Sequence, residues 1–327
     1  MKKTTVVIPN LNGERYIRKC LKSIDRLRYD IVVVDNGSKD RSCDIIRKEF
    51  PYVRLLENER NLGFCSAVNA GVREADTEYV FLLNNDAFLS PDCIGKLERF
   101  MDGKSDAFSC QARIMSALHP EVIDDDGDLY SVMGWAFCPS KGKTADRGEG
   151  MIKGAERVFS CCACAALYRK DVWDRLGGMD ERHFAYLEDV DTGWRANKEG
   201  YGNYCLNSAT AWHLGSASSG SRYNAFKAVQ SARNSVFIIG KNMTPWQKAL
   251  NFVPFAAGFA VKTCFYAKYG LWMEYLSGLF KGLILLSRCD RTDVYFRAGE
   301  GMPPGNRLKT ELGLESMMIK AAFRRFG

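Results

Sequence analysis

The chain has 327 residues and a mass of 36.8 kDa, with 46% hydrophobic and 26% charged residues. This composition excludes a disordered chain, a collagen-like fibre and a multi-span membrane protein. The net charge of +7 is unevenly distributed, because residues 226–327 carry 15 basic and 6 acidic side chains, whereas residues 1–225 carry 31 and 33. The opening residues contain too few apolar side chains for a signal peptide, so the twelve cysteines are expected to be reduced cytoplasmic thiols.

The first hundred residues alternate short apolar runs with helical patterns. Continuous apolar strands separated by helices are typical of a mainly parallel sheet that is covered on both faces. The sequence therefore predicts an α/β fold, and the acidic stretch at 124–128 is predicted to be a solvated loop. Strands are predicted at 4–9, 30–35, 53–56, 79–83, 107–115 and 158–168, and helices at 16–27, 40–50 and 63–75.

Polar side chains follow the first four predicted strands. The strand ends are Pro9-Asn10, Asp35-Asn36, Glu57-Asn58 and Asn84-Asn85-Asp86. Turn residues are common where strands end. However, ligands of parallel sheets bind outside the carboxyl ends of the strands, so four polar ends at one edge favour a polar cleft.

Four residues at three places in the sequence are candidates for chemistry, and each has a structural alternative. Asp86 either holds Mg²⁺ or Mn²⁺ through its carboxylate or forms a turn. Glu188 and Asp189 begin an acidic run, where they either stabilise a helix N-terminus or supply a general base. His213, one of three histidines, taken alone fits a packed or solvated side chain. The chain contains neither a GxxxxGK[ST] loop nor a GxGxxG turn after the first strand, which excludes these two nucleotide-binding devices.

Six blocks, taken together, carry a resemblance to a known family. The chain resembles the family-2 nucleotide-sugar glycosyltransferases, which have the GT-A fold, and within them the rhamnosyltransferases of bacterial cell-surface polysaccharide assembly. The blocks follow the family's order over about residues 4–218, two thirds of the chain. They are VVIPNLNGERYI (6–17), IVVVDNGSKD (31–40), ENERNLGFCSAVNAGV (57–72), FLLNNDAF (81–88), LGGMDERHFAYLEDVDTGWRANKEGY (176–201) and AWHLGSAS (211–218).

The resemblance implies roles for individual residues. Pro9, Asn10 and Asp35 would line the nucleobase and ribose pocket, and Asn61 and Asn69 would lie near the donor. Asn84, Asn85 and Asp86 occupy the family's DxD position, with Asp86 as the metal-binding carboxylate and asparagine in place of the first aspartate. Asp189, in the pair with Glu188, would be the catalytic base, and His213 would help to hold the metal or the diphosphate.

These roles describe an inverting sugar transfer. Asp189 would accept a proton from the attacking acceptor hydroxyl, while Mn²⁺ or Mg²⁺ on Asp86 would neutralise charge on the departing nucleoside diphosphate. The glycine- and serine-rich segment 215–220 predicts a mobile loop over the diphosphate, with Arg222 as a phosphate contact.

The basic C-terminal third shows helical patterns at 226–240, 246–269 and 271–287, in which aromatic residues alternate with lysines. Four alternatives follow for this segment. Its helices lie on an anionic membrane surface, pack on the catalytic part, form a homodimer interface, or span a membrane. A nucleic-acid partner is not expected, because no binding motif accompanies the charge.

We therefore predict a GT-A catalytic domain at 1–225, with a nucleotide-sugar half up to about residue 100 and an acceptor half from 101. An amphipathic helical segment at 226–300 and a basic tail at 301–327 are expected to follow. The predicted enzyme moves a sugar from a UDP- or dTDP-linked donor, with dTDP-rhamnose as one candidate, to a lipid-linked or polysaccharide acceptor at the inner face of the cytoplasmic membrane. The alternatives are a sugar nucleotidyltransferase and a catalytically silent nucleotide-sugar-binding scaffold.

Overall fold

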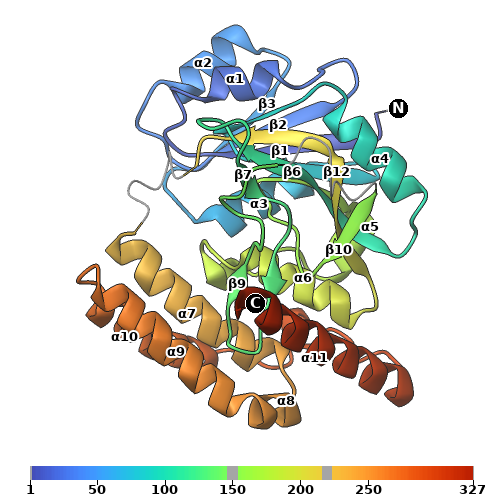
Figure 1. Ribbon diagram of the computed structural model, residues 1–327. Helices are drawn as coiled ribbons and strands as arrows, with labels where there is room; N and C mark the ends of the chain where they lie inside the picture. The colour runs from blue at the N-terminus through green and yellow to red at the C-terminus, as the bar shows by residue number, and fades with distance from the viewer. Residues whose placement is uncertain (1, 146–153, 216–222, 327) are drawn as a thin grey trace.

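The computed structural model describes residues 2–145, 154–215 and 223–326. Its centre is a ten-stranded sheet that is packed between helices, with a further group of C-terminal helices below it in Figure 1. The strand order is β10-β12-β6-β11-β4-β1-β2-β3, with β5 paired to β12 and β7 paired to β6. The strands are β1 (Thr4–Asn10), β2 (Asp30–Asp35), β3 (Arg54–Glu57), β4 (Tyr79–Leu83), β5 (Ala87–Leu89), β6 (Ala107–Ser116), β7 (Ile123–Asp125), β10 (Ala155–Val158), β11 (Ala165–Arg169) and β12 (Gly202–His213), with a separate pair β8 (Leu129–Tyr130) and β9 (Ala136–Phe137).

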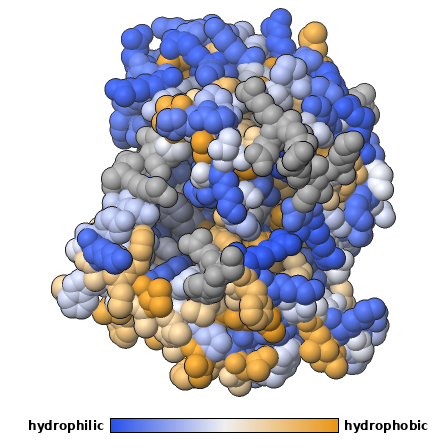
Figure 2. Space-filling model, in the orientation of Figure 1, coloured by the Kyte–Doolittle hydropathy of each residue, from blue (hydrophilic) through white to orange (hydrophobic). Residues whose placement is uncertain are grey.

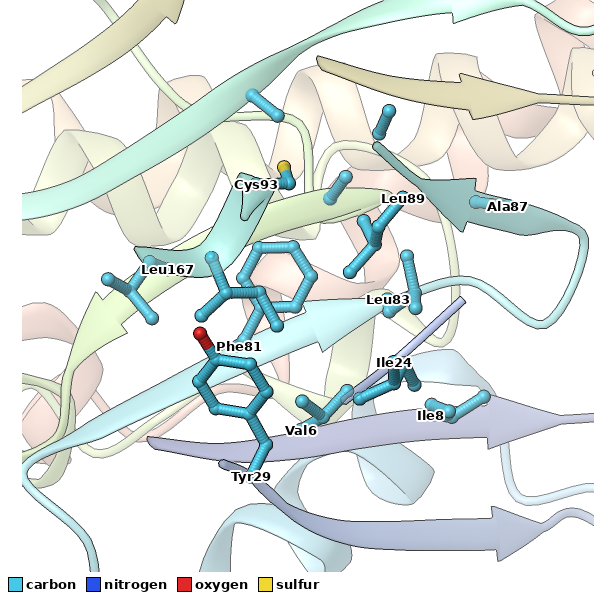
Figure 3. Packing of buried hydrophobic residues seen from close by; sticks show 14 of the residues in the cluster. Val6, Ile8, Ile24, Tyr29, Phe81, Leu83, Ala87, Leu89, Cys93 and Leu167 are labelled. Carbon is cyan, nitrogen blue, oxygen red and sulfur yellow. The ribbon is translucent and has the colours of Figure 1, made fainter. Parts of the chain in front are cut away.

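The N-terminal half of the sheet is parallel, as the apolar runs predicted. β1 pairs in parallel with β2 and β4, and β2 pairs in parallel with β3. Alternate side chains of these strands enter two separate cores, one on each face of the sheet. Val6, Ile8 and Phe81 lie in the first core (Figure 3), and Val7 and Leu82 lie in the second. Burial on both faces explains why these strands contain no alternating polar positions.

The second half of the sheet is mixed. β11 runs antiparallel to both β4 and β6, and β12 runs parallel to β6. The short β5 pairs antiparallel with the end of β12, so that Ala87 lies opposite His213. Two residues that are far apart in the sequence, Asp86 and His213, are thereby brought to adjacent strands.

Two predictions for the middle of the chain were wrong. The run predicted as one strand at 158–168 forms β10 and β11, because the backbone turns at 159–164 and the two strands pair with different partners. The acidic stretch at 124–128 is not a solvated loop. Asp125 is buried at the end of β7, where its carboxylate accepts hydrogen bonds from Gln111 Nε2 and the Gly127 amide at 2.9 Å each.

The C-terminal third is helical. The pattern at 246–269 forms two helices that meet at Asn251, and most of the expected basic tail forms α11. α11 packs near α6 and β8 and borders a groove of about 830 Å³. The helices are α1 (Ile17–Lys22), α2 (Ser42–Glu49), α3 (Phe64–Arg73), α4 (Cys93–Asp102), α5 (Lys170–Arg175), α6 (Glu188–Lys198), α7 (Ala225–Asn242), α8 (Pro245–Leu250), α9 (Phe252–Ala267), α10 (Trp272–Ser287) and α11 (Pro304–Phe326), with 3₁₀ turns η1 (Glu181–His183) and η2 (Val294–Phe296).

Helices α7 to α10 form a layer below the sheet, and α11 crosses beside it (Figure 1). Within the described part of the chain, none of the helices combines the length and the hydrophobicity that crossing a bilayer requires. The division of the chain at residue 225 stays a prediction.

Candidate active site

The carboxyl ends of β1, β2 and β4 meet through a chain of buried side-chain hydrogen bonds. Asn10 Nδ2 donates to Asp35 Oδ1 at 2.7 Å and to Ser42 Oγ at 3.0 Å. Asn85 Nδ2 in turn donates to Asn10 Oδ1 at 2.8 Å. Asp35 also accepts the Ser38 amide at 2.9 Å. Asn10 and Asp35, which were predicted for the nucleotide pocket, are thus in direct contact, and Asn10 also contacts Asn85 of the predicted DxD position. Pro9 precedes Asn10 in β1 opposite Val34.

Two predicted donor residues take part in loop structure. Asn61 Oδ1 accepts from Asn36 Nδ2 at 2.9 Å and from the Gly63 amide, which fixes the turn before α3. Asn69 is buried in α3 and exchanges two hydrogen bonds with the backbone of Met179, at 2.7 and 3.0 Å. Both side chains therefore position backbone segments. Their contact with a donor stays a prediction, and Arg222 lies outside the described residues.

Asp86 and His213 form the second part of the site. His213 Nε2 lies 3.3 Å from Asp86 Oδ1, and its Nδ1 lies 2.7 Å from Asp124 Oδ2. Lys141 Nζ contacts the other Asp124 oxygen at 2.5 Å. Asp86 is almost completely buried, and Asn84, two residues before it, is half-buried at the turn into β5. Asp124 and Lys141 were not predicted, and the only sequence signal was an acidic residue next to an apolar strand.

The charges of this group depend on one another. Burial opposes protonation of His213, but the hydrogen bonds to Asp124 and Asp86 outweigh burial and raise the pKa of the imidazole to about 9. Burial also opposes ionisation of Asp124, yet His213 and Lys141 lower the pKa of its carboxyl to about 2. Asp124 is therefore an acceptor at neutral pH, and it orients the imidazole so that Nε2 faces Asp86.

Glu188 and Asp189 lie in the first turn of α6, as the acidic run predicted. Burial raises the pKa of Glu188 to about 8, and the charge of Asp189 reinforces the shift. Burial raises the pKa of Asp189 to about 6, opposed by the Val190 amide, which donates to Oδ1 at 2.8 Å. Glu188 Oε2 has no hydrogen-bond partner among the described residues. Burial therefore favours the protonated form of both carboxyls, and more strongly for Glu188 than for Asp189.

The segment Ala163-Cys164 links the two carboxylate groups of the site. The Ala163 amide is near enough to Asp189 to lower its pKa, while the Cys164 carbonyl accepts the Asn84 amide at 3.0 Å. The charge of Asp86 in turn contributes to the raised pKa of the Cys164 thiol. Asp86 and Asp189 consequently border the same short turn, although 103 positions separate them in the sequence.

The loop that leads into Glu188 and Asp189 has unusual backbone geometry. Phe184, Tyr186 and Leu187 have φ values of 63°, 70° and 65°, in the left-handed region that side chains other than glycine rarely adopt. Asn234 of α7 stabilises this loop, because its Nδ2 lies 3.1, 2.9 and 2.7 Å from the carbonyl oxygens of residues 183, 185 and 186. Such strain is typical of functional sites whose surroundings hold it in place.

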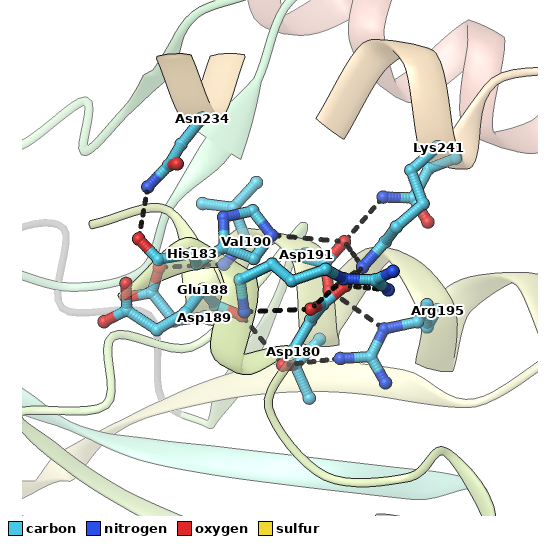
Figure 4. A network of polar contacts seen from close by, with 12 residues as sticks. Asp180, His183, Glu188, Asp189, Val190, Asp191, Arg195, Asn234 and Lys241 are labelled. Carbon is cyan, nitrogen blue, oxygen red and sulfur yellow. Dashed lines mark hydrogen bonds and ion pairs between the residues drawn. The ribbon is translucent and has the colours of Figure 1, made fainter. Parts of the chain in front are cut away.

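A buried ionic network joins α6 to α7 (Figure 4). Lys241 Nζ of α7 lies 2.8 Å from Asp180 Oδ2 and 2.7 Å from an Asp191 oxygen, and Arg195 Nε lies 3.0 Å from Asp191. Asp180, His183 and Asp191 have the ligand types and the spacing of a metal site. The Lys241 ammonium already supplies the positive charge between the two carboxylates, so we interpret the network as structural. Sequence analysis missed it, because Lys241 lies just beyond the helical pattern predicted at 226–240 and residue order gives no sign of its distant partners.

Comparisons with known proteins agree with this architecture. The model of the family "Glycosyl transferase family 2" matches residues 5–177. An N-acetylglucosaminyl-diphospho-decaprenol L-rhamnosyltransferase of Mycobacterium tuberculosis is 26% identical over 268 residues, which are 74% of this chain and 84% of the relative. A mannosyltransferase from Pyrobaculum calidifontis, solved with GDP-Man and Mn²⁺, superposes with a TM-score of 0.54 at 14% identity over 99% of this chain and 87% of its own. GalNAc-T7, solved with UDP, GalNAc and Mn²⁺, superposes with a TM-score of 0.56 at 14% identity over 74% of this chain and 48% of its own.

The structural likenesses confirm the predicted GT-A fold. The family model covers more than half of the chain, including β1 to β4 and the Asn84-Asn85-Asp86 turn. This chain therefore belongs to glycosyl transferase family 2.

Proposed function

We propose that the chain is an inverting, metal-dependent glycosyltransferase of bacterial cell-surface glycan synthesis. Its donor would be a UDP- or dTDP-linked sugar, and its acceptor a hydroxyl of a lipid-linked or polysaccharide glycan. The observation that carries the proposal is the turn at Ala163-Cys164, which joins Asp86 and its partner His213 to Asp189. Leaving-group stabilisation and base catalysis need such groups on opposite sides of one sugar.

The donor would lie across the carboxyl ends of β1, β2 and β4. Asn10, Asp35 and Asn85 form a fixed polar floor there, since each is buried and hydrogen-bonded. Pro9 would pack against the base, and Asp35 would contact the ribose. Asn61, Asn69, Asn84 and Arg222 complete the proposed donor site.

The residues around Asp86 fit Mn²⁺ or Mg²⁺. A buried carboxylate and an imidazole nitrogen converge within 3.3 Å, and the other ring nitrogen binds the Asp124 carboxylate, as is usual for metal-ligating histidines. When bound, the ion would neutralise charge on the diphosphate. Asp86 and His213 would hold the ion, which would displace the proton from Nε2 of the imidazole, while Asp124 fixes the orientation of the ring.

Asp189 would act as the base, beside Glu188, whose protonated form burial favours more strongly. As the acceptor oxygen bonds to the anomeric carbon, the bond from that carbon to the diphosphate oxygen breaks and the hydroxyl proton passes to the Asp189 carboxylate. The electron pair leaves with the nucleoside diphosphate. A single displacement of this kind inverts the anomeric configuration without a covalent enzyme intermediate.

Rhamnose is the sugar that we propose, with dTDP-rhamnose as donor and a lipid diphosphate-linked glycan as acceptor. The mycobacterial relative is named for rhamnosyl transfer to N-acetylglucosaminyl-diphospho-decaprenol, and the match spans 84% of its length. Membership of a glycosyl transferase family disfavours the nucleotidyltransferase alternative. Sugar transfer from a donor to an acceptor would distinguish an active enzyme from a catalytically silent scaffold.

We expect Asp86→Ala to abolish the metal-dependent part of donor binding. In the wild type, dTDP or UDP with Mn²⁺ at 100 times Kd should stabilise the native state by about 2.7 kcal/mol, which thermal denaturation measures. In the variant, adding Mn²⁺ should produce no further shift. The matched control is Asp76→Ala, an exposed acidic residue outside the site, which should respond like the wild type. Undiminished metal-dependent binding in Asp86→Ala would show that Asp86 does not hold the metal.

The pH dependence should follow Asp189. Its carboxylate is the active form, and its pKa is raised to about 6, so kcat/KM should reach a plateau above this pH that extends to about pH 8, where Glu188 ionises. Below the pKa of Asp189, kcat/KM should fall about tenfold per pH unit as the carboxylate is protonated. Steady-state kinetics under conditions in which the fold remains intact would test this, and a profile that stays flat well below pH 5 would contradict the assignment.

A further inference from the structure

Helices α9 and α10 expose an extended apolar surface. In α10 the exposed apolar residues follow helical spacing along one side, and the start of α9 is similarly exposed. Phe252, Val253 and Phe280 are 70%, 73% and 64% exposed. We call this set the α9–α10 surface, and Figure 2 shows apolar residues gathered over this end of the molecule. Its large exposed members are Phe252, Val253, Val261, Phe265, Tyr269, Trp272, Met273, Leu276, Phe280 and Leu283.

The opposite sides of the two helices are used for packing. Gly278 and Gly282 of α10 approach α7 so closely that an added Cβ would lie 2.5 and 2.6 Å from its backbone carbonyl oxygens. Gly258 of α9 approaches the Met133 carbonyl in the same way, and its own carbonyl accepts Trp135 Nε1 at 3.2 Å. The inner faces are thus packed, whereas the outer faces carry equally apolar side chains that are exposed. Phe265 and Tyr269 contact the ring of Tyr223 at one end of this surface, and Phe252, Val253 and Phe280 remain largely exposed. Helices that are apolar on all sides are normally covered on all sides.

The charge around the surface indicates what covers it. Residues 245–288 contain five basic side chains and one acidic one, Glu274. Lys268 and Lys281 are exposed, and Lys268 lies with Tyr269 and Trp272 at the turn that connects the two helices. Apolar side chains bordered by lysine, tyrosine and tryptophan match the boundary between headgroups and acyl chains of an anionic bilayer.

We propose that the α9–α10 surface docks the protein on an anionic lipid membrane, with both helices lying along the interface. The biological role of this docking rests on the proposed function, because docking would bring the active site to a lipid-linked acceptor. A second copy of the chain fits less well. A two-fold contact through this surface would place the same basic residues of both copies in one interface, with a single acidic residue per copy to compensate them.

Co-sedimentation of the full chain with vesicles tests the proposal. We expect binding to phosphatidylcholine vesicles that contain phosphatidylglycerol, weaker binding to phosphatidylcholine alone, and a decline as salt rises. The double variant Val253→Ser, Phe280→Ser should bind about ten- to a hundredfold more weakly, because two inserted side chains are lost. Leu27→Ser, which changes an 81% exposed leucine after α1, is the matched control and should bind like the wild type.

A second variant separates charge from insertion. Lys268→Gln, Lys281→Gln should remove most of the preference for phosphatidylglycerol while the far-ultraviolet circular dichroism remains unchanged. Failure to bind either vesicle, equal binding to both, or unchanged binding of the Val253, Phe280 variant would overturn the proposal. A solution dimer that the same double variant dissociates would also overturn it, in favour of a second copy.

The outcome is distinguishable from a failure of the proposed function. Transfer to a water-soluble, short-chain acceptor does not require docking, so the Val253, Phe280 variant should retain the wild-type kcat in that assay. Absence of transfer by the wild type would contradict the proposed activity, irrespective of the result of the vesicle experiment. Normal transfer without vesicle binding would overturn the docking surface alone.

Discussion

Asp189→Asn is expected to lower kcat by about 10²- to 10⁴-fold, because the variant keeps the shape of the side chain but cannot accept the proton of the acceptor hydroxyl. The α6 N-terminus should remain intact, since the asparagine Oδ1 can still accept the Val190 amide. The measurement is the rate of rhamnose transfer from dTDP-rhamnose to a lipid diphosphate-linked acceptor. Donor binding, followed by thermal denaturation, should not change.

Two controls make this result specific. Asp171→Asn changes an exposed acidic residue in the first turn of α5, which matches the helix position of Asp189 without its surroundings, and should leave kcat unaltered. Glu188→Gln should have a small effect, because burial favours the protonated form of Glu188 and glutamine resembles that form. If Glu188→Gln reduced kcat as strongly as Asp189→Asn, or if Asp189→Asn kept most of the activity, the base would have to be sought elsewhere.

Lys241→Met is expected to lower the free energy of unfolding by about 3–5 kcal/mol, as measured by urea denaturation. The ammonium group is completely buried between Asp180 and Asp191, and methionine fills similar space without the charge. Burial would raise the pKa of Asp180, but Lys241 and Arg182 hold it at about 2, so the variant leaves an incompletely compensated buried carboxylate. The loss should therefore exceed that of any exposed ion pair.

Lys170→Met provides the matched comparison. Its ammonium group lies 2.6 Å from Asp174 in an i,i+4 pair on the surface of α5, and such pairs contribute about 0–1 kcal/mol. The double variant Lys241→Met, Asp180→Asn should recover part of the loss, since it removes one of the two carboxylates left behind. A cost below 1 kcal/mol for Lys241→Met alone would show that the network does not stabilise the fold.

The sequence by itself determined the parallel half of the fold and the residues at its edge. The apolar runs of β1, β2 and β4 are unbroken because both faces are buried, which is a local and readable signal. The residues that end these strands must then meet at one edge, and Asn10, Asp35 and Asn85 do form a connected group. The acidic opening of α6 was equally evident from residue order alone.

Only the tertiary structure decided which distant residues complete the site. Asp124 contacts His213 across 89 positions, and Lys241 contacts Asp180 across 61, because the strand order and the packing of α7 bring them together. Asn234 stabilises the loop before Glu188 for the same reason. The spacing of apolar residues in a helix predicts which face is buried. It does not distinguish a lysine that will be buried from one that will be exposed, because it contains no information about the segment against which the helix packs. The physical reason is that side-chain burial, and with it every shifted pKa in the site, depends on contacts between segments that are far apart in the chain.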